Sequence, residues 1–328
     1  MVRAAVLLCA WLLDALIGDP HSLPHPVRWM GSLIAWLERV LRPRFSASPE
    51  RERVGGRWMV FLVLTVCCSC IVILLYILEK LSVILNFAVS VVICTYMLAL
   101  RSLRDESTRV ERKLEAGDLP AARKALSWIV GRDTEELSDE AVARAAVETV
   151  AENASDGVIA PLLYMALFGP LGGVLYKAVN TMDSMVGYHN QRYEHWGCTA
   201  AQLDDVCNFL PARISGLLLC AAAPLVGLDG AAAWRIFCRD RLNHKSPNSA
   251  HTEAACAGAL GVQLGGPSRY FGQWVDKPTI GDALRKVEAD DIHRANDLTA
   301  AGSFLALAVC CALNILFDFL ITGGILHG

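Results

Sequence analysis

Two long uncharged stretches restrict the possible folds of this chain more than any other feature. They cover residues 58–78 and 81–100, and only Glu79 and Lys80 lie between them. Because a helix rises about 1.5 Å per residue, roughly 20 apolar residues are needed to cross the hydrocarbon core of a bilayer. Each stretch meets that length, so the sequence predicts a transmembrane helical hairpin over residues 58–100.

The composition of the whole chain fits a membrane protein. Of 328 residues, 54% are hydrophobic and 19% are charged, against about 25% charged in ordinary soluble domains. The net charge of −3 gives no electrostatic basis for binding nucleic acid, so no nucleic-acid partner is expected. The 12 cysteines lie mostly in apolar runs. We therefore expect small apolar side chains in a reduced protein, not a disulfide framework or a zinc site.

Both ends of the chain also carry apolar runs. Residues 2–17 contain one acid, Asp14, and precede a polar turn without a small-residue cleavage site. We therefore expect a retained helix at the membrane rather than a signal peptide. Asp14 is expected to face protein, because an acid that faces lipid is strongly destabilising. The final run predicts a C-terminal transmembrane helix over residues 301–322.

Two middle segments, residues 158–176 and 209–228, are apolar but interrupted by proline and glycine. Such breaks at membrane depth are tolerated where neighbouring protein satisfies the freed backbone groups. We expect short or broken membrane-embedded helices that form a polar cavity. The predicted fold is an all-α polytopic helical bundle, a single membrane-embedded domain over residues 1–328, with its catalytic helical region at residues 101–300.

Three stripes of polar residues at helical spacing indicate what lines that cavity. The stripes are Glu148, Glu152 and Asp156, then Lys177, Asn180, Asp183 and Ser184, and finally Asp204 and Asn208. Residues four apart share one face of a helix, and a solvated surface helix would carry more Lys and Glu. We interpret the stripes as parts of one polar site. Three ordinary amphipathic helices packed together are the alternative.

The segment GDPHSLPHPVRWMG, residues 18–31, holds three prolines. It is predicted to be a fixed loop, because proline removes a helical hydrogen bond. The loop would present Asp19, His21, His25 and Arg28. Its histidines are compatible with a metal site, although histidines more often bond backbone carbonyls. Arg28 is a candidate for anion binding.

Further polar segments flank the apolar ones. Residues 42–57 are predicted to be a polar linker. The sequence GRDT at 131–134 places Arg132 in a turn that belongs to a site or is only a capped helix start. A second polar turn carries Lys245 and Asn248. Basic side chains in such turns are typical ligands of phosphate.

Taken together, the motifs resemble a known family. The matching stretches are GDPHSLPHPVRWMG, VGRDT, RAAVETVAENASDGVIAPL, YKAVNTMDSMVGY, LDDVCNFLPAR, SPN and GALGVQLGGP. In this order they look like the adenosylcobinamide-phosphate synthase family of cobalamin biosynthesis (CbiB/CobD), from Asp14 to about Leu298. Two local details depart from the family pattern. Ser249, Ala250 and His251 follow SPN where the family has Ala-Gly, and GYHNQRY stands where the family has GYKNERY.

The resemblance implies a membrane enzyme that joins adenosylcobyric acid, a corrinoid substrate, to an aminoalcohol phosphate, usually 1-amino-2-propanol O-phosphate. ATP would drive this amide formation together with Mg²⁺. A carboxylate is a poor electrophile and is most simply activated as an acyl phosphate. Such a site needs carboxylates for Mg²⁺, cations for phosphates and a base for the amine. Other membrane-bound cobalamin-assembly enzymes are partners to expect.

The candidate residues follow from these needs and from the matched motifs. The catalytic candidates are Glu148, Glu152, Lys177 and Asp183, and the Mg²⁺ candidates are Glu148, Glu152, Asp156, Asp204 and Asp205. The substrate-binding candidates are Asp19, His25, Arg28, Arg132, Asn153, Asn180, Tyr188, Arg192, Arg213, Lys245 and Asn248. Lys177, Arg192 and Arg213 are the predicted phosphate ligands. Internal ion pairs are the alternative for these acids and bases.

Arginine-rich segments, residues 39–57 and 101–144, flank the predicted hairpin on the same side. By the positive-inside rule that side is cytoplasmic. The expected location is therefore the inner (cytoplasmic) membrane, in contact with lipid and with the active site facing the cytoplasm. Because ATP is cytoplasmic, the loop 18–31, the polar stripes and the turn 244–253 are expected to converge on that side.

Two other classes of protein remain as alternatives. One is a membrane alcohol-phosphate transferase acting on lipid, but the expected DG-x-x-AR core is absent, since VIAP follows Asp156-Gly157. The other is a transporter or membrane scaffold without chemistry. A transporter predicts internal repeats, and the sequence shows no convincing duplication.

Overall fold

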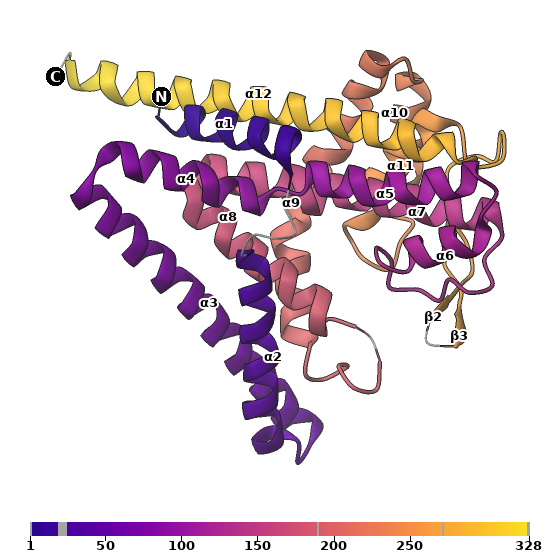
Figure 1. Ribbon diagram of the computed structural model, residues 1–328, viewed down its shortest axis with the longest axis horizontal. Coiled ribbons are helices and arrows are strands. Elements are labelled where there is room, and N and C mark those ends of the chain that lie inside the picture. The colour runs from indigo at the N-terminus through magenta and orange to yellow at the C-terminus, as the bar shows by residue number, and fades with distance from the viewer. Residues whose placement is uncertain (1, 19–24, 189, 271, 327–328) are drawn as a thin grey trace. The chain divides into compact units, whose positions relative to one another are not determined.

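The structure, a computed structural model, describes residues 2–18, 25–188, 190–270 and 272–326, with side chains to residue 320. Most of this chain is helical (Figure 1). Within the described residues, five helices are long and apolar enough to cross a membrane: Pro49–Leu81, Val83–Glu115, Asp139–Val186, Cys198–Val226 and Asp290–Leu320. The predicted all-α, polytopic membrane architecture is confirmed.

Contacts within the chain divide it into two compact units. Unit 1 comprises residues 1–98, 161–208 and 309–328, and unit 2 comprises residues 99–160 and 209–308. Each unit combines segments that are far apart in the sequence, so long-range packing defines both. The single domain expected over the whole chain stays a prediction.

Unit 1 contains the predicted hairpin and the helices packed on it. Its elements are α1 (Val2–Ile17), α2 (Pro26–Phe45), α3 (Pro49–Leu81), α4 (Val83–Met97), most of α8 (Ala160–Val186), the first part of α9 (Cys198–Ala222) and the end of α12 (Asp290–Leu326). In Figure 1, α1 runs along α4 and α2 runs beside α3, and both pairs are in contact. Asp14 of α1 is buried, as predicted for an acid in such a helix.

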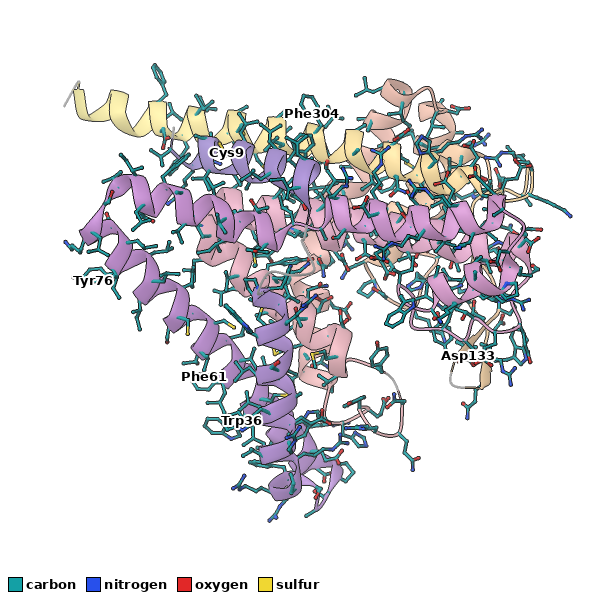
Figure 2. All side chains as sticks on the ribbon, viewed as in Figure 1. Cys9, Trp36, Phe61, Tyr76, Asp133 and Phe304 are labelled. Atoms are coloured by element: carbon teal, nitrogen blue, oxygen red, sulfur yellow. The ribbon has the colours of Figure 1, made fainter. Side chains whose placement is uncertain are left out.

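The predicted hairpin over residues 58–100 is confirmed, and one residue turns the chain between α3 and α4. Ser82 has an extended backbone, and its hydroxyl accepts a hydrogen bond from the Leu85 amide as the N-cap of α4. Phe61 and Tyr76 project from α3 (Figure 2) and are largely exposed. Exposure of large apolar side chains is expected where lipid is the solvent.

Two predicted loops are wrong in part, and proline accounts for both. Pro26 and Pro49 lie in the first turns of α2 and α3, where a proline is favoured because its missing N–H would have no helical partner. The predicted loop 18–31 is therefore helical from residue 26 onward. The predicted linker 42–57 shrinks to residues 46–48.

The broken membrane-embedded segments are only partly as predicted. Within α8, Gly169 has a positive φ of 64° and Pro170 follows it, so the helix is interrupted there. In contrast, α9 continues through Pro211, and the predicted shortening at that proline is wrong. A helical proline leaves the carbonyl four residues earlier without its partner. Here the Tyr164 hydroxyl donates to that carbonyl, which belongs to Cys207, at 3.0 Å.

Unit 2 consists of shorter helices and four short strands. Its helices are α5 (Leu100–Glu115), α6 (Leu119–Leu126), α7 (Asp139–Asn153), the π-helix η1 (Ala154–Ile159), the end of α9, the 3-10 helix η2 (Ala223–Val226), α10 (Gly230–Asp240), α11 (Ser249–Leu260) and the start of α12. Two antiparallel pairs follow α11: β1 (Leu264–Gly265) with β4 (Thr279–Ile280), and β2 (Ser268–Tyr270) with β3 (Gln273–Val275). The sequence did not predict these strands, because two or three residues are too few to show an alternating pattern.

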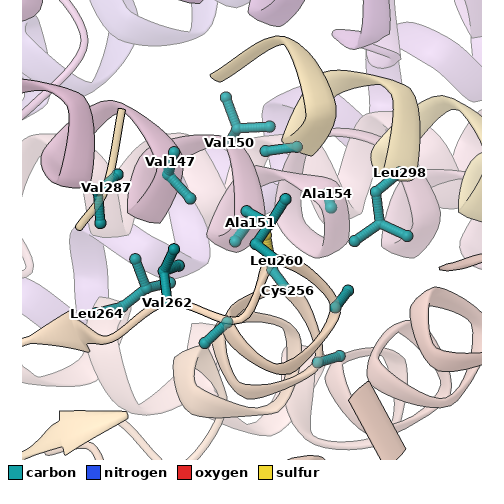
Figure 3. Packing of buried hydrophobic residues seen from close by; sticks show 14 of the residues in the cluster. Val147, Val150, Ala151, Ala154, Cys256, Leu260, Val262, Leu264, Val287 and Leu298 are labelled. Carbon is teal, nitrogen blue, oxygen red and sulfur yellow. The ribbon is translucent and has the colours of Figure 1, made fainter. Parts of the chain in front are cut away.

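Helices α7 and α11 lie at the centre of unit 2 because their residues are small enough for close packing. Every residue of α11 is buried, and a Cβ atom added at Gly258 would lie 2.6 Å from the carbonyl oxygen of Ala232 in α10. Figure 3 shows Ala151 of α7 beside Cys256 and Leu260 of α11 within one apolar cluster. This packing fixes the polar ends of α7 and α11 relative to each other.

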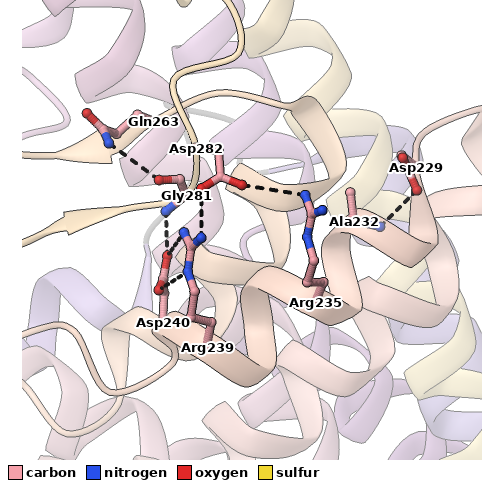
Figure 4. A network of polar contacts seen from close by, with 8 residues as sticks. All are labelled: Asp229, Ala232, Arg235, Arg239, Asp240, Gln263, Gly281 and Asp282. Carbon is pink, nitrogen blue, oxygen red and sulfur yellow. Dashed lines mark hydrogen bonds and ion pairs between the residues drawn. The ribbon is translucent and has the colours of Figure 1, made fainter.

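A charged network attaches β4 and the residues after it to α10 (Figure 4). The Asp240 carboxylate accepts hydrogen bonds from the Gly281 amide at 2.8 Å and from Nε and Nη2 of Arg239. Arg239 also binds Asp282 at 2.7 Å. The hydrogen bonds from Arg239 lower the pKa of Asp240, although burial opposes this effect. The ionised Asp240 therefore links two segments that flank α11.

Candidate functional site

The acidic face of α7 is held by two segments that are distant in the sequence. Glu148 forms an ion pair with Arg132 from the turn before α7, and its Oε1 accepts a hydrogen bond from the Gly265 amide at 2.7 Å. Arg132 also donates to the Ser268 hydroxyl at 3.3 Å. Burial lowers the pKa of Arg132, but Glu148, Tyr270 and Glu253 together outweigh burial, so the pKa of Arg132 is raised. Two predicted site residues thus lie together as an ion pair.

Glu152, one turn further along α7, contacts the start of α11. The Ser249 hydroxyl donates to Oε1 of Glu152 at 2.8 Å. The preceding residue, Asn248, accepts a hydrogen bond from Nη1 of Arg213 at 3.4 Å. Consecutive residues at the start of α11 therefore connect this helix to α7 on one side and to α9 on the other.

Glu253 joins these acids, and it was not among the predicted site residues. It lies one turn after Ser249 on α11 and is 6% exposed. Burial raises its pKa well above the ordinary value, and the carboxylates of Glu152 and Glu148 raise it further. In the sequence, the feature that could have pointed to Glu253 is its spacing of four residues from Ser249, which places both residues on one helix face. We refer to Glu148, Glu152 and Glu253 as the acidic cluster.

Three basic groups accompany the acidic cluster, and two of them were missed. Besides Arg132, Lys277 lies close enough to affect the charges of the cluster, and its ammonium donates to the Tyr270 hydroxyl at 2.6 Å. His244 is half-buried, and burial lowers its pKa although the nearby Glu152 acts in the opposite direction. The sequence does not single out Lys277, because only the pairing of β4 with β1 brings its segment back to α7.

The predicted stripe on α7 does not continue as one α-helical face. At Ala154 the helix changes into the π-helix η1, whose wider turn rotates the side chains that follow. Asp156 lies in this turn and is half-buried. The Asn153 side chain donates to the carbonyl of Thr149 in its own helix at 2.9 Å. Glu148 and Glu152 therefore share a regular α-helical face, and Asp156 is offset from it.

In unit 1 the second and third predicted stripes meet. Asp204 of α9 is buried, and its carboxylate accepts hydrogen bonds from Asn208 at 2.9 Å and from Asn180 of α8 at 3.5 Å. Asn208 in turn accepts a hydrogen bond from the Tyr176 hydroxyl at 2.8 Å. The polar faces of α8 and α9 therefore pack against each other, which fits both the predicted polar site and the alternative of packed amphipathic helices.

Arg192, one of the three predicted phosphate ligands, pairs with an acid. Its guanidinium lies 3.1 Å from Glu38 of α2 and 5.0 Å from the centre of the Tyr193 ring. The side chain is 65% exposed, so this pair is screened by solvent and contributes little stability. An internal ion pair was the alternative for this cation, and Glu38 is a partner that the sequence did not suggest.

One of the other candidates in unit 1 caps a helix. His25 is the N-cap of α2, where its ring nitrogen accepts a hydrogen bond from the Val27 amide at 3.2 Å. Asp19 and His21 lie outside the described residues. The half-buried or exposed candidates are Arg28, Lys177, Asp183, Tyr188 and Asp205. The roles expected for them stay predictions.

The oxygen, nitrogen and sulfur donors of the described residues bear on the predicted Mg²⁺ site. In the described chain, no three or more histidines, cysteines, aspartates or glutamates are arranged to hold a metal ion. In nucleotide sites, however, Mg²⁺ is usually held by one or two carboxylates together with substrate phosphates. Glu152 fits that chemistry, because its Oε1 is bonded to Ser249 and its Oε2 has no hydrogen bond to another described residue. The Mg²⁺ assignment stays a prediction.

A cavity of about 850 Å³ is lined in part by Arg132, the partner of Glu148. The turn before α7 and the β2–β3 hairpin line it, with Arg132, Ser268, Arg269 and Trp274 among the lining residues. Arg132 contributes both to this cavity and to the ion pair with Glu148. Unit 2 therefore has room for a substrate beside Arg132, a cation whose side chain is 13% exposed.

Comparison with known proteins gives consistent matches along the chain. The family model described as CobD/Cbib protein matches residues 7–299. The cobalamin biosynthesis protein CobD of Citrobacter koseri is 49% identical over 94% of this chain and 96% of its own length. The cobalamin biosynthesis protein CbiB of Salmonella arizonae is 49% identical over 92% of this chain and 95% of its own.

A third relative gives a similar result. The cobalamin biosynthesis protein CobD of Geobacter metallireducens is 52% identical over 87% of this chain and 88% of its own length. No solved structure matches the chain. The family match covers α7, α11 and the acidic cluster between them. The chain therefore belongs to the CobD/CbiB family, as its motifs predict.

Proposed function

We propose that this chain catalyses ATP-dependent amide formation between the carboxylate of adenosylcobyric acid and the amine of an aminoalcohol phosphate, such as 1-amino-2-propanol O-phosphate. The product would be adenosylcobinamide phosphate, an intermediate of cobalamin biosynthesis. The observation that carries the proposal is the acidic cluster with Arg132 beside a cavity in unit 2. The curated relatives of the chain are named cobalamin biosynthesis proteins, which supports a role of the chain in that pathway.

The proposed chemistry has two steps. An oxygen of the substrate carboxylate attacks the terminal phosphorus of ATP, ADP leaves, and an acyl phosphate forms. The amine nitrogen then attacks the acyl carbon, phosphate leaves with the electron pair of the broken C–O bond, and the amine proton passes to a base. In total, a carboxylate, an amine and ATP give an amide, ADP and phosphate. Fixed cations stabilise the charge of the transferred phosphoryl group.

The residues of the acidic cluster and its neighbours suit these needs. Arg132 is a cation on the cavity wall, and Glu148 holds its guanidinium in place, which suits contact with a phosphate. Glu253 suits the base, because a carboxyl whose pKa is raised accepts a proton more readily at neutral pH. In this assignment Glu148 orients Arg132 and does not itself touch the substrate.

Mg²⁺ fits the same site through Glu152. When bound, the ion neutralises charge on the phosphates of ATP. Glu152 would hold it together with oxygens of the substrate, as the Oε2 atom without a hydrogen bond permits. Ser249 keeps the Glu152 carboxylate in one orientation through Oε1.

The proposed location is the inner (cytoplasmic) membrane, with the site on the cytoplasmic side. Five helices that can cross a membrane and arginine-rich segments on either side of the α3–α4 hairpin support it. The substrates ATP, corrinoid and aminoalcohol phosphate would then enter from the cytoplasm. Membrane lipid and other membrane-bound enzymes of cobalamin assembly are the expected partners.

The test is direct conversion by the full-length chain in detergent. Adenosylcobyric acid, 1-amino-2-propanol O-phosphate, ATP and Mg²⁺ are mixed with the protein, and the products are identified by mass spectrometry. We expect adenosylcobinamide phosphate only when ATP is present. Glu253→Gln should lower kcat at least a hundredfold, since general-base catalysis contributes about 10²–10⁴.

A control variant lies on α7, the helix that carries Glu148 and Glu152. Glu140→Gln also removes an acid from α7, but this acid pairs with Arg144 one turn away and should leave kcat within about twofold. Absence of ATP-dependent product from the folded wild-type chain would contradict the proposed reaction. Equal activity of Glu253→Gln and wild type would contradict the role of Glu253.

A further inference from the structure

The first turn of α11 separates two sets of charged groups. On the α7 side, Ser249 bonds Glu152, and Glu253 lies one turn further along the same face. On the α9 side, Asn248 bonds Arg213. Because residues 248 and 249 are consecutive, with Cα atoms about 3.8 Å apart, an acidic side and a basic side meet at one end of this helix.

The basic side contains cations that lack acidic partners. Arg213 contacts the carbonyl and the ring of Phe209 as well as Asn248. Arg241 lies over the ring of Phe237 at 5.7 Å, and Lys245 is exposed in the turn before α11. Among the described residues, neither arginine nor this lysine forms an ion pair with a carboxylate. No carboxylate of the described residues therefore pairs with any of these three cations near the start of α11.

His251 gives an independent indication that a ligand binds on this side. It is fully buried, and neither of its ring nitrogens has a hydrogen-bond partner in the described structure. Its ring lies 5.9 Å from that of Phe237, the residue that Arg241 also covers. A buried imidazole without a partner is destabilising. A bound group that accepts a hydrogen bond would remove that cost.

The imidazole lies close to the unpaired cations. Burial and then the charges of Arg213 and Arg241 lower the pKa of His251 to about 4. The Pro247 carbonyl opposes this effect, but it does not meet hydrogen-bonding geometry with the ring. At neutral pH the ring is uncharged and offers one N–H donor beside two guanidinium groups.

The helix itself adds to the basic side. α11 has 12 residues, and the first N–H groups of a helix have no intrahelical acceptors and attract anions. The Asn248 side chain does not cap these groups, since it is directed to Arg213. The Gly216 position shows how closely α9 approaches here, because a Cβ atom there would lie 2.7 Å from the His251 carbonyl oxygen.

We propose that the first turn of α11 binds a zwitterionic aminoalcohol phosphate, with its phosphate toward Arg213 and its amine toward Glu253. This inference rests on the proposed function, which supplies such a molecule as substrate. The amine and the phosphate of an aminoalcohol phosphate are separated by two carbons, so opposite charges must be met within one short site. The two sides of the α11 start provide that arrangement. The amine would then lie beside the acid assigned as base.

ATP is the other source of phosphate, and steady-state kinetics separate the two. Arg213→Gln in the full-length chain should raise the KM for 1-amino-2-propanol O-phosphate at least tenfold and leave the KM for ATP unchanged. Unphosphorylated 1-amino-2-propanol should react equally with wild type and variant. Arg235→Gln is the matched control, because it removes an arginine of α10 that already pairs with Asp282. A raised KM for ATP alone would overturn the proposal.

Direct binding tests the orientation without any turnover. Isothermal titration uses 1-amino-2-propanol O-phosphate and isopropyl phosphate, which lacks the amine. Arg213→Gln should weaken both at least tenfold, whereas Glu253→Gln should weaken only the ligand with an amine. Arg241→Gln serves as a second phosphate-side variant if Arg213→Gln does not fold. Equal weakening of both ligands by Glu253→Gln, or no weakening by either arginine variant, would overturn the orientation.

These outcomes distinguish the binding site from the reaction. If ligand binding depends on Arg213 but the chain forms no amide, the binding site is supported and the proposed ligase function is contradicted. If Arg213→Gln and Arg241→Gln form the amide with wild-type KM values, the ligase function is supported and this binding site is contradicted.

Discussion

The Ser249 hydroxyl donates a hydrogen bond of 2.8 Å to the Glu152 carboxylate, and this contact joins α11 to the acidic face of α7. Both residues lie at positions that depend on the packing of small side chains between the two helices. The contact fixes one oxygen of Glu152 and leaves the other for a ligand. It therefore connects the packing of unit 2 to the proposed chemistry.

Removing this hydrogen bond should reduce activity more than stability. Ser249→Ala should lower kcat/KM roughly tenfold, because a carboxylate without its donor loses about 1–2 kcal/mol of orientation and hydrogen bonding. The apparent affinity for Mg²⁺ should fall with it. Thr65→Ala is the control, since that hydroxyl is exposed and bonds the carbonyl of Phe61 in its own helix. Unchanged kcat/KM in Ser249→Ala would contradict the role assigned to Glu152.

The Tyr164 hydroxyl should stabilise α9 because Pro211 interrupts its hydrogen bonds. Tyr164→Phe leaves the Cys207 carbonyl without its donor and should lower the free energy of unfolding by about 1 kcal/mol. Pro211→Ala restores a backbone N–H that can donate to this carbonyl, so the loss from Tyr164→Phe should shrink in that background. Thermal unfolding of the four proteins in detergent measures this double-mutant cycle. Additive effects would show that the tyrosine does not compensate for the proline.

The Asp240 network should give a pH-dependent contribution to stability. Arg239 lowers the pKa of Asp240 in the folded state. The stabilisation that the ionised Asp240 provides is therefore present above its unfolded pKa of about 4 and is lost as pH falls through its folded pKa. Asp240→Asn should therefore lower stability at pH 7 by about 1–2 kcal/mol, a modest value because Arg239 is half exposed. The difference in Tm between wild type and variant should shrink below about pH 4. An unchanged difference at pH 3.5 would contradict this assignment.

The proposed orientation in the membrane can be tested at two exposed residues. Tyr188 and Lys245 lie in different units and are both exposed. Tyr188→Cys and Lys245→Cys, each in a background without the 12 native cysteines, should resist an impermeant thiol reagent in intact cells. Both should react after permeabilisation of the membrane. Labelling of either cysteine from outside the cell would contradict a single cytoplasmic face for the predicted site residues.

The hairpin of unit 1 was predictable because the hydropathy of a long stretch follows from its own residues and does not depend on how distant segments pack. The starts of α2 and α3 were not, since Pro26 and Pro49 interrupt a helix or begin one depending on position. The same ambiguity concerns Pro211, whose tolerance depends on the distant Tyr164. Local sequence rules therefore show that these prolines affect helices, but they do not show whether each proline begins a helix, interrupts it or is tolerated within it.

The candidate site was predictable where residues lie on one helix and not where packing brings them together. Glu148 and Glu152 share a face because of their spacing, but η1 ends the regular helix before Asp156. Glu253 joins them only because α11 packs on α7, and Lys277 only because β4 pairs with β1. The ion pair between Arg132 and Glu148 was foreseen as an alternative, without its partner being known.

The central claim is amide formation through phosphoryl transfer from ATP to the corrinoid carboxylate. Adenosylcobyric acid labelled with heavy oxygen in that carboxylate tests it most directly, with the full-length chain, ATP, Mg²⁺ and 1-amino-2-propanol O-phosphate. The account predicts ADP, adenosylcobinamide phosphate and inorganic phosphate that carries one labelled oxygen from the carboxylate. Amide formation without ATP, or with unlabelled phosphate, would contradict it.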